Sequence, residues 1–262
     1  MNLFEAENIE VSYGKKKIID GISFSLSKNS VLGILGVNGS GKTTLLKAIC
    51  GINNYNGDCK VRGKTIKNLS AKDISHICAY VPQKSGLSID ISALEVVLQG
   101  FNPDLNLFEY PNKKMVEQAK GVLSDLGLSD KISENYLNLS EGQKQICILA
   151  RALVSRGNLL LLDEPESAID FGGRYRMMKH IKNWISEGER GAIITLHDPQ
   201  LALNSCDALL LISKGKSLGT IYPKEDSAEK IEKMLCEIYG NLSVKKALNK
   251  KGESCFALIR ED

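Results

Sequence analysis

The sequence predicts an α/β fold in which a largely parallel sheet carries an antiparallel N-terminal part and an inserted block of helices. Three patterns support this prediction: strand-like alternation with frequent turns before residue 84, helical periodicity without a strand between residues 84 and 158, and alternating strands and helices from residue 159 onward. We expect one domain over residues 1–262, with an α/β core at 1–83 and 159–262 and a helical subdomain at 84–158. This length suffices for a sizeable buried core.

In the first part of the chain, apolar and polar residues alternate between turns. One helix is predicted from Lys42 through Ile49, with Gly51 as its stop signal. The predicted strands are Leu3–Tyr13, Ile18–Ser27, Val31–Gly36, Cys59–Arg62 and Ile77–Val81. Apolar residues at helical spacing then predict the helices of the insertion. These are Ile91–Gln99, Asn112–Leu126 and Glu141–Ser155.

The last part of the chain alternates strands with helices, which implies crossover connections and a parallel sheet. The predicted strands are Leu159–Leu162, Ala192–Leu196, Ala208–Ile212 and Cys255–Ile259. The predicted helices are Gly173–Ser186, Pro199–Ser205 and Ala228–Tyr239.

Composition excludes several classes of protein. The 34 Lys and Arg residues exceed the 31 Asp and Glu residues by only three, so the charge does not indicate nucleic-acid binding, and we expect no such partner. No apolar run approaches the roughly 18 to 20 residues of a membrane span, and the acidic start lacks a signal peptide, so we expect a soluble cytosolic chain. The seven cysteines include no CxxC pair, which argues against a zinc site or a disulfide framework. We expect all seven to be reduced.

A glycine-rich loop is the strongest local signal. Residues Gly36–Thr43 match GxxxxGK[ST] at every fixed position, between an apolar strand and a helix. Glycines let successive N–H groups wrap around phosphate, and the helix N-terminus favours an anion. We expect Lys42 to reach the β- and γ-phosphates of a nucleotide and the Thr43 hydroxyl to ligate Mg²⁺. The alternative is a plain turn, but the strand–loop–helix setting favours nucleotide binding.

Two acids follow a run of four leucines. Asp163 and Glu164 come at the end of the predicted buried strand Leu159–Leu162. We expect Asp163 to hold Mg²⁺, directly or through water, and Glu164 to be the base for the water that attacks the γ-phosphate. Taken alone, the pair is equally compatible with a solvated strand end. The phosphate loop in the same chain favours the catalytic interpretation.

The segment Leu139–Gln143 precedes an amphipathic helix and allows two interpretations. Ser140 with Gln143 three residues later forms a capping box, which accounts for both residues without any ligand. The functional alternative is that this helix N-terminus is a second anion site for a nucleotide bound elsewhere.

With these motifs, the chain resembles the ATP-binding subunits of ABC transporters over nearly its whole length. Gly36–Thr43 resembles Walker A, Leu159–Glu164 resembles Walker B, and Leu139–Gln143 resembles the LSGGQ signature. Four further matches follow the family's order: Tyr13 at the position of the adenine-stacking aromatic, Tyr80–Gln83 as the Q-loop, Ser167–Asp170 as the D-loop and Ile194–Asp198 around the switch histidine. Seven motifs in order leave little room for coincidence.

The resemblance implies ATP and Mg²⁺ as ligands and assigns roles to individual residues. The implied catalytic residues are Glu164, His197 and Gln83, and the implied metal ligands are Thr43, Gln83 and Asp163. The implied nucleotide-binding residues are Tyr13, Gly36, Asn38, Gly39, Ser40, Gly41, Lys42, Thr43, Thr44, Ser140, Gly142, Gln143 and Asp170.

The resemblance also implies partners. Two copies would face head to tail around two ATP molecules, bound to transmembrane permease subunits at the cytoplasmic face of the membrane, with an extracytoplasmic substrate-binding protein acting indirectly. Three residues depart from the family pattern: Glu141 stands where Gly is usual, Ile146 where Arg is common and Glu166 where Thr is common. A carboxylate near an incoming γ-phosphate can weaken binding by charge repulsion, so we expect reduced affinity at worst and not a dead site.

Three shorter stretches narrow the class of transporter. Gln99–Phe108, His197–Leu203 and Leu235–Gly240 resemble importers of iron chelates, haem and cobalamin, and a molybdate-type importer would look much alike. A soluble ABC ATPase of an assembly complex, such as iron–sulfur cluster assembly, stays the alternative from another class. A regulatory subunit that binds ATP but hydrolyses it poorly is a third possibility. The cargo contacts the permease and the binding protein, so no residue of this chain identifies it.

Overall fold

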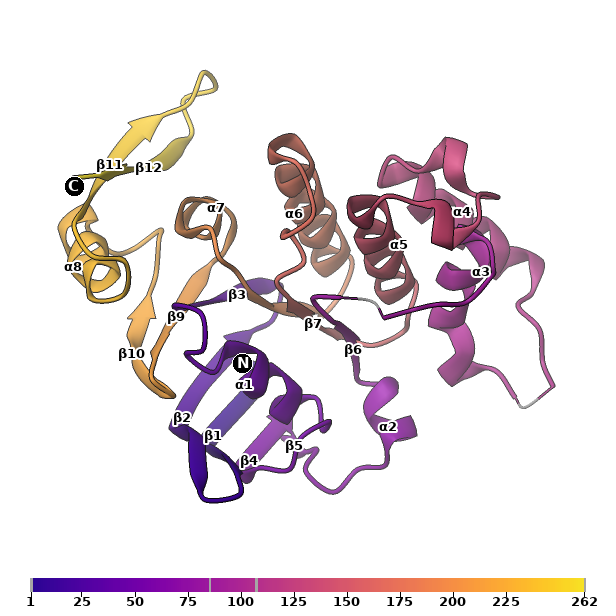
Figure 1. Ribbon diagram of the computed structural model, residues 1–262, viewed down its shortest axis with the longest axis horizontal. Coiled ribbons are helices and arrows are strands. Elements are labelled where there is room, and N and C mark those ends of the chain that lie inside the picture. Colours follow the sequence, from indigo (N-terminus) through magenta and orange to yellow (C-terminus); the bar gives the residue numbers. More distant parts are fainter. Residues whose placement is uncertain (1, 85, 107, 262) are drawn as a thin grey trace. The chain divides into compact units, whose positions relative to one another are not determined.

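The computed structural model describes residues 2–84, 86–106 and 108–261 and confirms the α/β class (Figure 1). The chain forms two compact units, of which the first comprises Met1–Lys67 with Ile193–Asp262 and the second comprises Asn68–Ala192. The chain passes from the second unit back into the first within strand β8 (Gly191–Thr195).

An antiparallel sheet of four strands begins the first unit, in the order β2-β1-β4-β5. These strands are β1 (Asn2–Tyr13), β2 (Lys16–Ser27), β4 (Asn56–Val61) and β5 (Lys64–Thr65). The pairing of β1 with β2 shifts register between Ala6 and Ile9, where Asn8 adopts a positive φ of 51°. This bulge keeps Phe4, Ala6, Ile9 and Val11 buried despite the extra residue.

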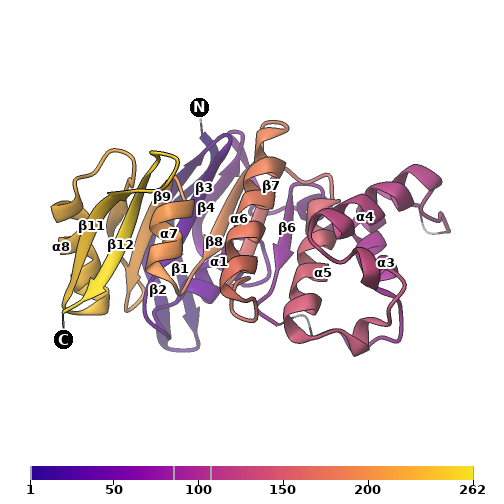
Figure 2. The ribbon, with the colours of Figure 1, turned by 90° about the horizontal axis from the view of Figure 1, so that it is seen from above.

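The first unit also contains parallel strands, with the order β10-β9-β3-β8. These are β3 (Ser30–Leu35), β9 (Ala208–Ser213) and the antiparallel β10 (Lys216–Ile221), beside β8. In β3 and β9 nearly every residue is buried, as expected for strands covered on both faces. Helix α1 (Lys42–Ile49) follows β3, and helix α7 (Pro199–Ser205) follows β8. The chain then forms helix α8 (Ala228–Tyr239) and a hairpin of β11 (Leu242–Leu248) and β12 (Ser254–Arg260) (Figure 2).

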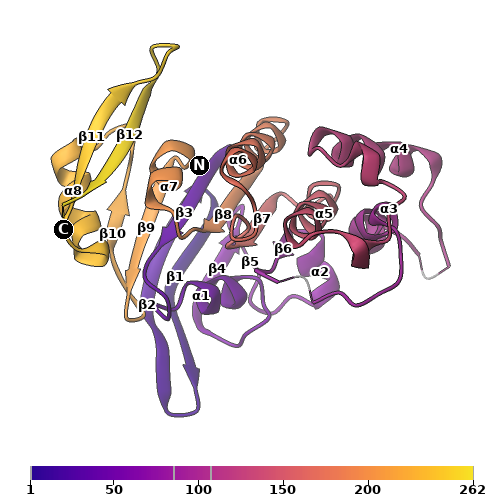
Figure 3. The same cartoon turned by 45° about the horizontal axis from the view of Figure 1, so that its top comes forward.

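The second unit pairs two parallel strands, β6 (Cys78–Val81) and β7 (Leu159–Asp163), and is otherwise helical. Its helices are α2 (Ala71–Ser75), α3 (Ala93–Leu98), α4 (Lys113–Asp125), α5 (Glu141–Leu153) and α6 (Phe171–Ser186), with 3₁₀ turns at Gln99–Asp104, Ser129–Lys131 and Tyr136–Asn138. Helices α3, α4 and α5 lie against one another (Figure 3), and Tyr136 is wholly buried. A Cβ on Gly100 would lie 2.1 Å from the Arg151 carbonyl oxygen, so the first 3₁₀ turn requires glycine to pack on α5.

Most of the predicted elements are confirmed, and the differences have local causes. The predicted helix Ile91–Gln99 begins at Ala93, because Ser92 and Glu95 form a capping box, and it continues as a 3₁₀ turn that contains Pro103. Helix α6 begins two residues before the predicted Gly173, because the Asp170 side chain caps it. The prediction does not include three strands, β5, β10 and β11, because their sequences lack a clear apolar alternation. It also does not include the five-residue helix α2, which buries none of its residues.

No helix within the described residues is long and apolar enough to cross a membrane. None of the seven cysteines forms a disulfide, and all seven lie within the described ranges. Five are buried, whereas Cys236 and Cys255 are partly exposed. Burial raises the pKa of the Cys59 thiol to about 11 and that of the Cys147 thiol to about 12.

Since the thiolate is the reactive form of cysteine, we expect selective labelling of the native protein. Iodoacetamide at pH 8 should modify Cys236 and Cys255, and it should modify the other five only after unfolding in guanidinium chloride. Peptide mass spectrometry with and without denaturant measures both patterns. Labelling of Cys147 in the native protein as fast as that of Cys255 would contradict the observed burial.

Candidate functional site

The glycine-rich loop of the first unit connects β3 to α1 with little free space. Gly39 and Gly41 have φ values of 77° and 106°, in the left-handed region that favours glycine. A Cβ on Gly41 would lie 2.6 Å from Ile19 Cδ1, and one on Gly36 would lie 2.3 Å from the Ile212 carbonyl oxygen. Glycine is therefore required by the backbone conformation at Gly39, by packing at Gly36 and by both at Gly41.

Two buried polar side chains lie in this loop. Lys42 is only 4% exposed, and its Nζ donates a hydrogen bond to the Gly36 carbonyl oxygen at 2.8 Å. The Ser40 hydroxyl is buried and has no hydrogen-bond partner within the described part of the chain. Because an unpaired buried hydroxyl is costly, a ligand with acceptor oxygens would satisfy it. A buried ammonium, a helix N-terminus and an unsatisfied hydroxyl together suit a phosphate group.

The other predicted residues of the first unit are more exposed. Tyr13 ends β1, is 55% exposed and accepts a hydrogen bond on its hydroxyl from Asn53 Nδ2 at 2.8 Å. Its ring is therefore held by the hydroxyl while remaining open for stacking. Asn38 is exposed, Thr43 and Thr44 are partly exposed in the first turn of α1, and His197 is exposed two residues after β8.

In the second unit, the structure brings the acid pair together with two residues of the Q-loop segment. Asp163 is 1% exposed and Glu164 is 6% exposed at the carboxyl end of β7. The Tyr80 hydroxyl donates to Asp163 Oδ2 at 3.3 Å, and Gln83 Nε2 donates to Glu164 Oε2. These contacts form because β6 and β7 are parallel neighbours whose carboxyl ends meet at one edge.

Glu164 combines burial with backbone strain. Its φ of 49° is uncommon for a non-glycine residue, and such conformations persist where the surrounding structure over-determines them. Buried carboxylates also require hydrogen-bonding partners, which Gln83 supplies. Gln145 Nε2 in turn donates to the Pro82 carbonyl oxygen at 3.2 Å and anchors the segment that carries Gln83. Burial, a fixed hydrogen-bonding partner and backbone strain together mark Glu164 as a candidate functional residue.

The signature segment lines a cavity of about 560 Å³ within the second unit. The predicted residues on its wall are Ser140, Gly142, Gln143 and Asp170. The Ser140 hydroxyl accepts from the Gln143 backbone N–H at 3.3 Å, and Gln143 Oε1 accepts from the Ser140 N–H at 2.9 Å, so the capping box is present. A Cβ on Gly142 would lie 2.6 Å from the Ala168 carbonyl oxygen, so α5 and the D-loop segment pack closely.

The departures from the family pattern have different surroundings. Glu141 has an 80% exposed side chain, and its carboxylate pairs with Lys144 Nζ at 3.0 Å, which partly offsets its charge. Ile146 lines the same cavity as Ser140, and Glu166 is buried. Lys144 was not singled out in the sequence, although its spacing of three residues from Glu141 on a helix is the signal for this pair.

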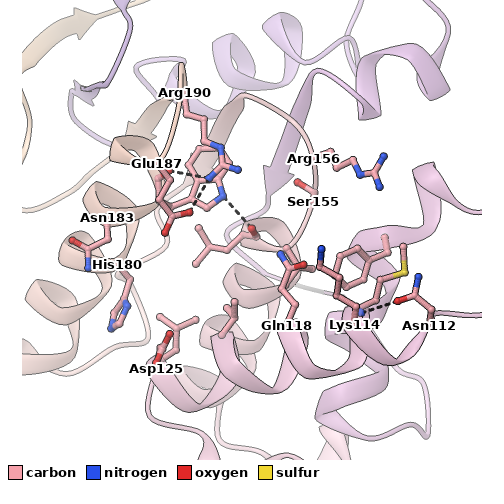
Figure 4. A pocket seen from close by; sticks show the side chains of 17 residues that line it. Asn112, Lys114, Gln118, Asp125, Ser155, Arg156, His180, Asn183, Glu187 and Arg190 are labelled. Atoms are coloured by element: carbon pink, nitrogen blue, oxygen red, sulfur yellow. Dashed lines mark hydrogen bonds and ion pairs between the residues drawn. The ribbon is translucent and has the colours of Figure 1, made fainter.

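A second cavity of about 510 Å³ lies between α4, the end of α5 and α6 (Figure 4). None of the motif residues lines it. Arg190 lies 4.5 Å from the Trp184 ring centroid and pairs with Glu187 at 3.3 Å, while Arg156 pairs with Asp104 at 3.1 Å. Because both guanidinium groups already have partners, this cavity does not define an anion site. The motif residues of each unit therefore remain the candidate functional residues.

The fold and the phosphate loop define an ATPase of the phosphate-loop class. The sequence profile of the family described as "ABC transporter" matches residues 19–167, more than half of the chain. The chain therefore belongs to the ABC transporter family, whose ATP-binding subunits bind and hydrolyse ATP. Membership implies permease partners and a pair of ATP-binding subunits.

Named relatives support the same assignment. The chain is 37% identical to a Helicobacter pylori protein named "Probable iron chelatin transport ATP-binding protein", over 81% of this chain and 84% of that protein. It is 30% identical to the "Hemin import ATP-binding protein HmuV" of Vibrio cholerae, over 90% of both. It is 33% identical to the "Manganese transport system ATP-binding protein MntB" of Bacillus subtilis, over 79% of this chain and 82% of that protein.

Solved structures agree on the fold. A nucleotide-free ATP-binding cassette from an ABC transporter matches with a TM-score of 0.78 and 26% identity, over 91% of this chain and 97% of the other. A chain from an ABC transporter in an inward-facing conformation matches 98% of this chain and 96% of its own length, with a TM-score of 0.80 at 24% identity. The latter likeness therefore extends to almost the whole fold.

Proposed function

We propose that this chain is the motor subunit of an importer for a metal complex such as an iron chelate, haem or a cobalamin-like compound. One observation carries the proposal: relatives named for iron chelatin, hemin and manganese transport align with about four fifths or more of the chain. The sequence of Gln99–Phe108 also resembles that of such importers. Leu107 within this stretch lies outside the described residues. A molybdate-type cargo stays the alternative within transport.

We assign the steps of hydrolysis to individual residues. Tyr13 stacks on adenine, the backbone of Gly36–Thr44 surrounds the phosphates, and Lys42 donates to the β- and γ-phosphates. Glu164 orients or deprotonates the attacking water, and His197 contacts the γ-phosphate. The buried Ser40 hydroxyl and the strained, buried Glu164 support these assignments, since neither is accounted for by packing alone.

The three residues proposed to hold magnesium carry oxygen donors. Mg²⁺ prefers oxygen ligands, and Thr43, Gln83 and Asp163 offer a hydroxyl, an amide and a carboxylate. Gln83 uses its amide nitrogen on Glu164, so its amide oxygen is the atom suited to a cation. When bound with ATP, the ion neutralises charge that develops on the phosphates. The domain division into a core at 1–83 and 159–262 and a helical subdomain at 84–158 is part of the same proposal.

We further propose a head-to-tail pair of copies, with Ser140, Gly142, Gln143 and Asp170 of one copy capping ATP on the other. The open cavity along these residues supports a ligand at this place. Closure follows from contacts that ATP makes only in the closed pair. Permease subunits hold the pair at the cytoplasmic face of the membrane, and an extracytoplasmic binding protein delivers the cargo to the permease.

The unusual acid of the signature gives a measurable prediction. The change Glu141→Gly should lower the KM for ATP about twofold to fivefold, because it removes an exposed carboxylate whose repulsion is only partly offset by Lys144. Steady-state ATPase assays measure this change, with Glu134→Gly as a control at a partly exposed acid outside the signature. A higher KM in the Glu141→Gly protein would mean that the carboxylate assists binding.

A pull-down tests the transport function. Tagged Glu164→Gln protein is incubated with ATP and detergent-solubilised membranes of its own cells, and bound proteins are identified by mass spectrometry. A multi-spanning permease is the expected partner, and its identity would narrow the cargo. Only soluble partners, from membranes that demonstrably contain such a permease, would favour the assembly ATPase instead. The rate of ATP turnover at saturating ATP distinguishes the importer motor and the assembly ATPase from a regulatory subunit, because the regulatory subunit would hydrolyse ATP poorly.

A further inference from the structure

The C-terminal hairpin of the first unit is attached by side chains at its outer edges. In an antiparallel pair, alternate residues of each strand direct their N–H and C=O groups away from the partner strand. On β11 the outward N–H of Val244 donates to Glu232 Oε2 of α8 at 2.8 Å. On β12 the outward groups of Phe256 and Leu258 are bonded by α7, which lies beside this strand (Figure 2).

Two amide side chains of α7 act in place of a neighbouring strand. Asn204 Nδ2 donates to the Phe256 carbonyl oxygen at 2.9 Å, and Asn204 Oδ1 accepts from the Phe256 N–H at 2.8 Å. Gln200 Oε1 accepts from the Leu258 N–H at 3.2 Å. Four residues of a helix rise about 6 Å and two residues of a strand about 6.8 Å, so the two amides match alternate residues of β12.

Helix α7 starts at Pro199, two residues after the proposed switch histidine, His197. Asp198 separates His197 from Pro199 and caps the helix by accepting from the Leu201 N–H at 3.0 Å. With seven residues, α7 is too short to be stable alone, so its position depends on what packs against it. Its apolar side, with Leu201, Ala202 and Leu203, is buried, and its amide side is bonded to the hairpin.

We infer that Gln200 and Asn204 are positioning residues for ATP hydrolysis: they dock α7 on the C-terminal hairpin and thereby hold His197 in place. This inference rests on the proposed role of His197. The hairpin is then more than a terminal extension of the fold, because the backbone groups of Phe256 and Leu258 provide the fixed surface against which α7 is held.

The test compares full-length proteins with the double change Gln200→Ala and Asn204→Ala against the wild type. Small displacements of a catalytic group reduce turnover steeply, so kcat should fall about tenfold while the affinity for ATP, measured by equilibrium binding, stays within about twofold. Hydrogen exchange should become faster at residues 197–205 and at Phe256 and Leu258, but not at residues 36–49. Unchanged kcat, or an equal loss of ATP affinity, would overturn the inference.

Two further variants test whether a fall in kcat arises from the contact between α7 and the hairpin and whether it acts through His197. Asn249→Ala removes the bonds that Asn249 makes to Glu253 within the hairpin turn, without touching α7, and should keep the wild-type kcat. A His197→Ala protein is assayed with radiolabelled ATP, which measures its residual turnover. Adding Gln200→Ala and Asn204→Ala to this protein should not lower kcat further. A further tenfold fall of kcat in the His197→Ala protein would show that Gln200 and Asn204 do not act through His197. If His197→Ala itself retains wild-type turnover, the proposed role of His197 fails, independently of the effect of the amides on α7.

Discussion

Replacing Glu164 by Gln is expected to reduce ATP turnover by about 10²- to 10⁴-fold while ATP binding persists, the range for loss of a general base. The substitution preserves the size of the side chain and an oxygen that can accept the Gln83 amide bond, so the β7 edge should keep its structure. The substitution removes the negative charge that we propose orients or deprotonates the attacking water. Phosphate release at saturating ATP, together with equilibrium binding of ATP, measures both quantities.

The same chemical change at another acid of the second unit provides the control. Glu187 lies just after α6, has an exposed side chain and pairs with Arg190 at 3.3 Å. Glu187→Gln should therefore leave turnover at the wild-type level. Wild-type turnover in the Glu164→Gln protein would show that the base is a different group.

Replacing Lys42 by Ala is expected to weaken ATP binding about 100-fold. The ammonium is buried beside the Gly36 carbonyl oxygen, so its bonds to phosphate would form away from water, and hydrogen bonds to charged groups contribute about 1.5–3 kcal/mol each. A loss of about 2.8 kcal/mol corresponds to the expected 100-fold. Titration with a fluorescent ATP analogue measures the dissociation constant.

Lys47 on the same helix is the matched control, since it lies in the last turn of α1 and away from the glycine-rich loop. Lys47→Ala should change the dissociation constant less than about threefold, because Lys47 is partly exposed and a charge in contact with solvent at this distance is screened. Thermal unfolding of both proteins checks that the fold persists. If the Lys42→Ala protein binds ATP as tightly as the Lys47→Ala protein, the loop is not the phosphate site.

The elements that the sequence predicts well are those with a strong local pattern. The four leucines Leu159–Leu162 form β7, and the apolar face of Glu141–Ser155 forms α5 behind its capping box. The sequence does not predict strand β10, because β10 is an edge strand with exposed residues and its pairing with β9 shifts register near Gly219. Strand β11 contains Lys245 and Lys246 in succession, which hides the alternation that Val244 begins. Edge strands bury too little to require apolar residues at every second position.

The sequence by itself determined the family, the order of the motifs and the residues proposed to bind ATP, because each motif is a contiguous stretch whose chemistry depends on local spacing. Only the tertiary structure decided which side chains meet: Gln83 with Glu164, Tyr80 with Asp163, and Gln200 and Asn204 with the hairpin. These partners lie between 52 and 83 residues apart, and several are backbone groups that every residue carries. Such contacts leave no pattern in a single sequence, since they arise only when strands and helices pack and their outward hydrogen-bonding groups must be satisfied.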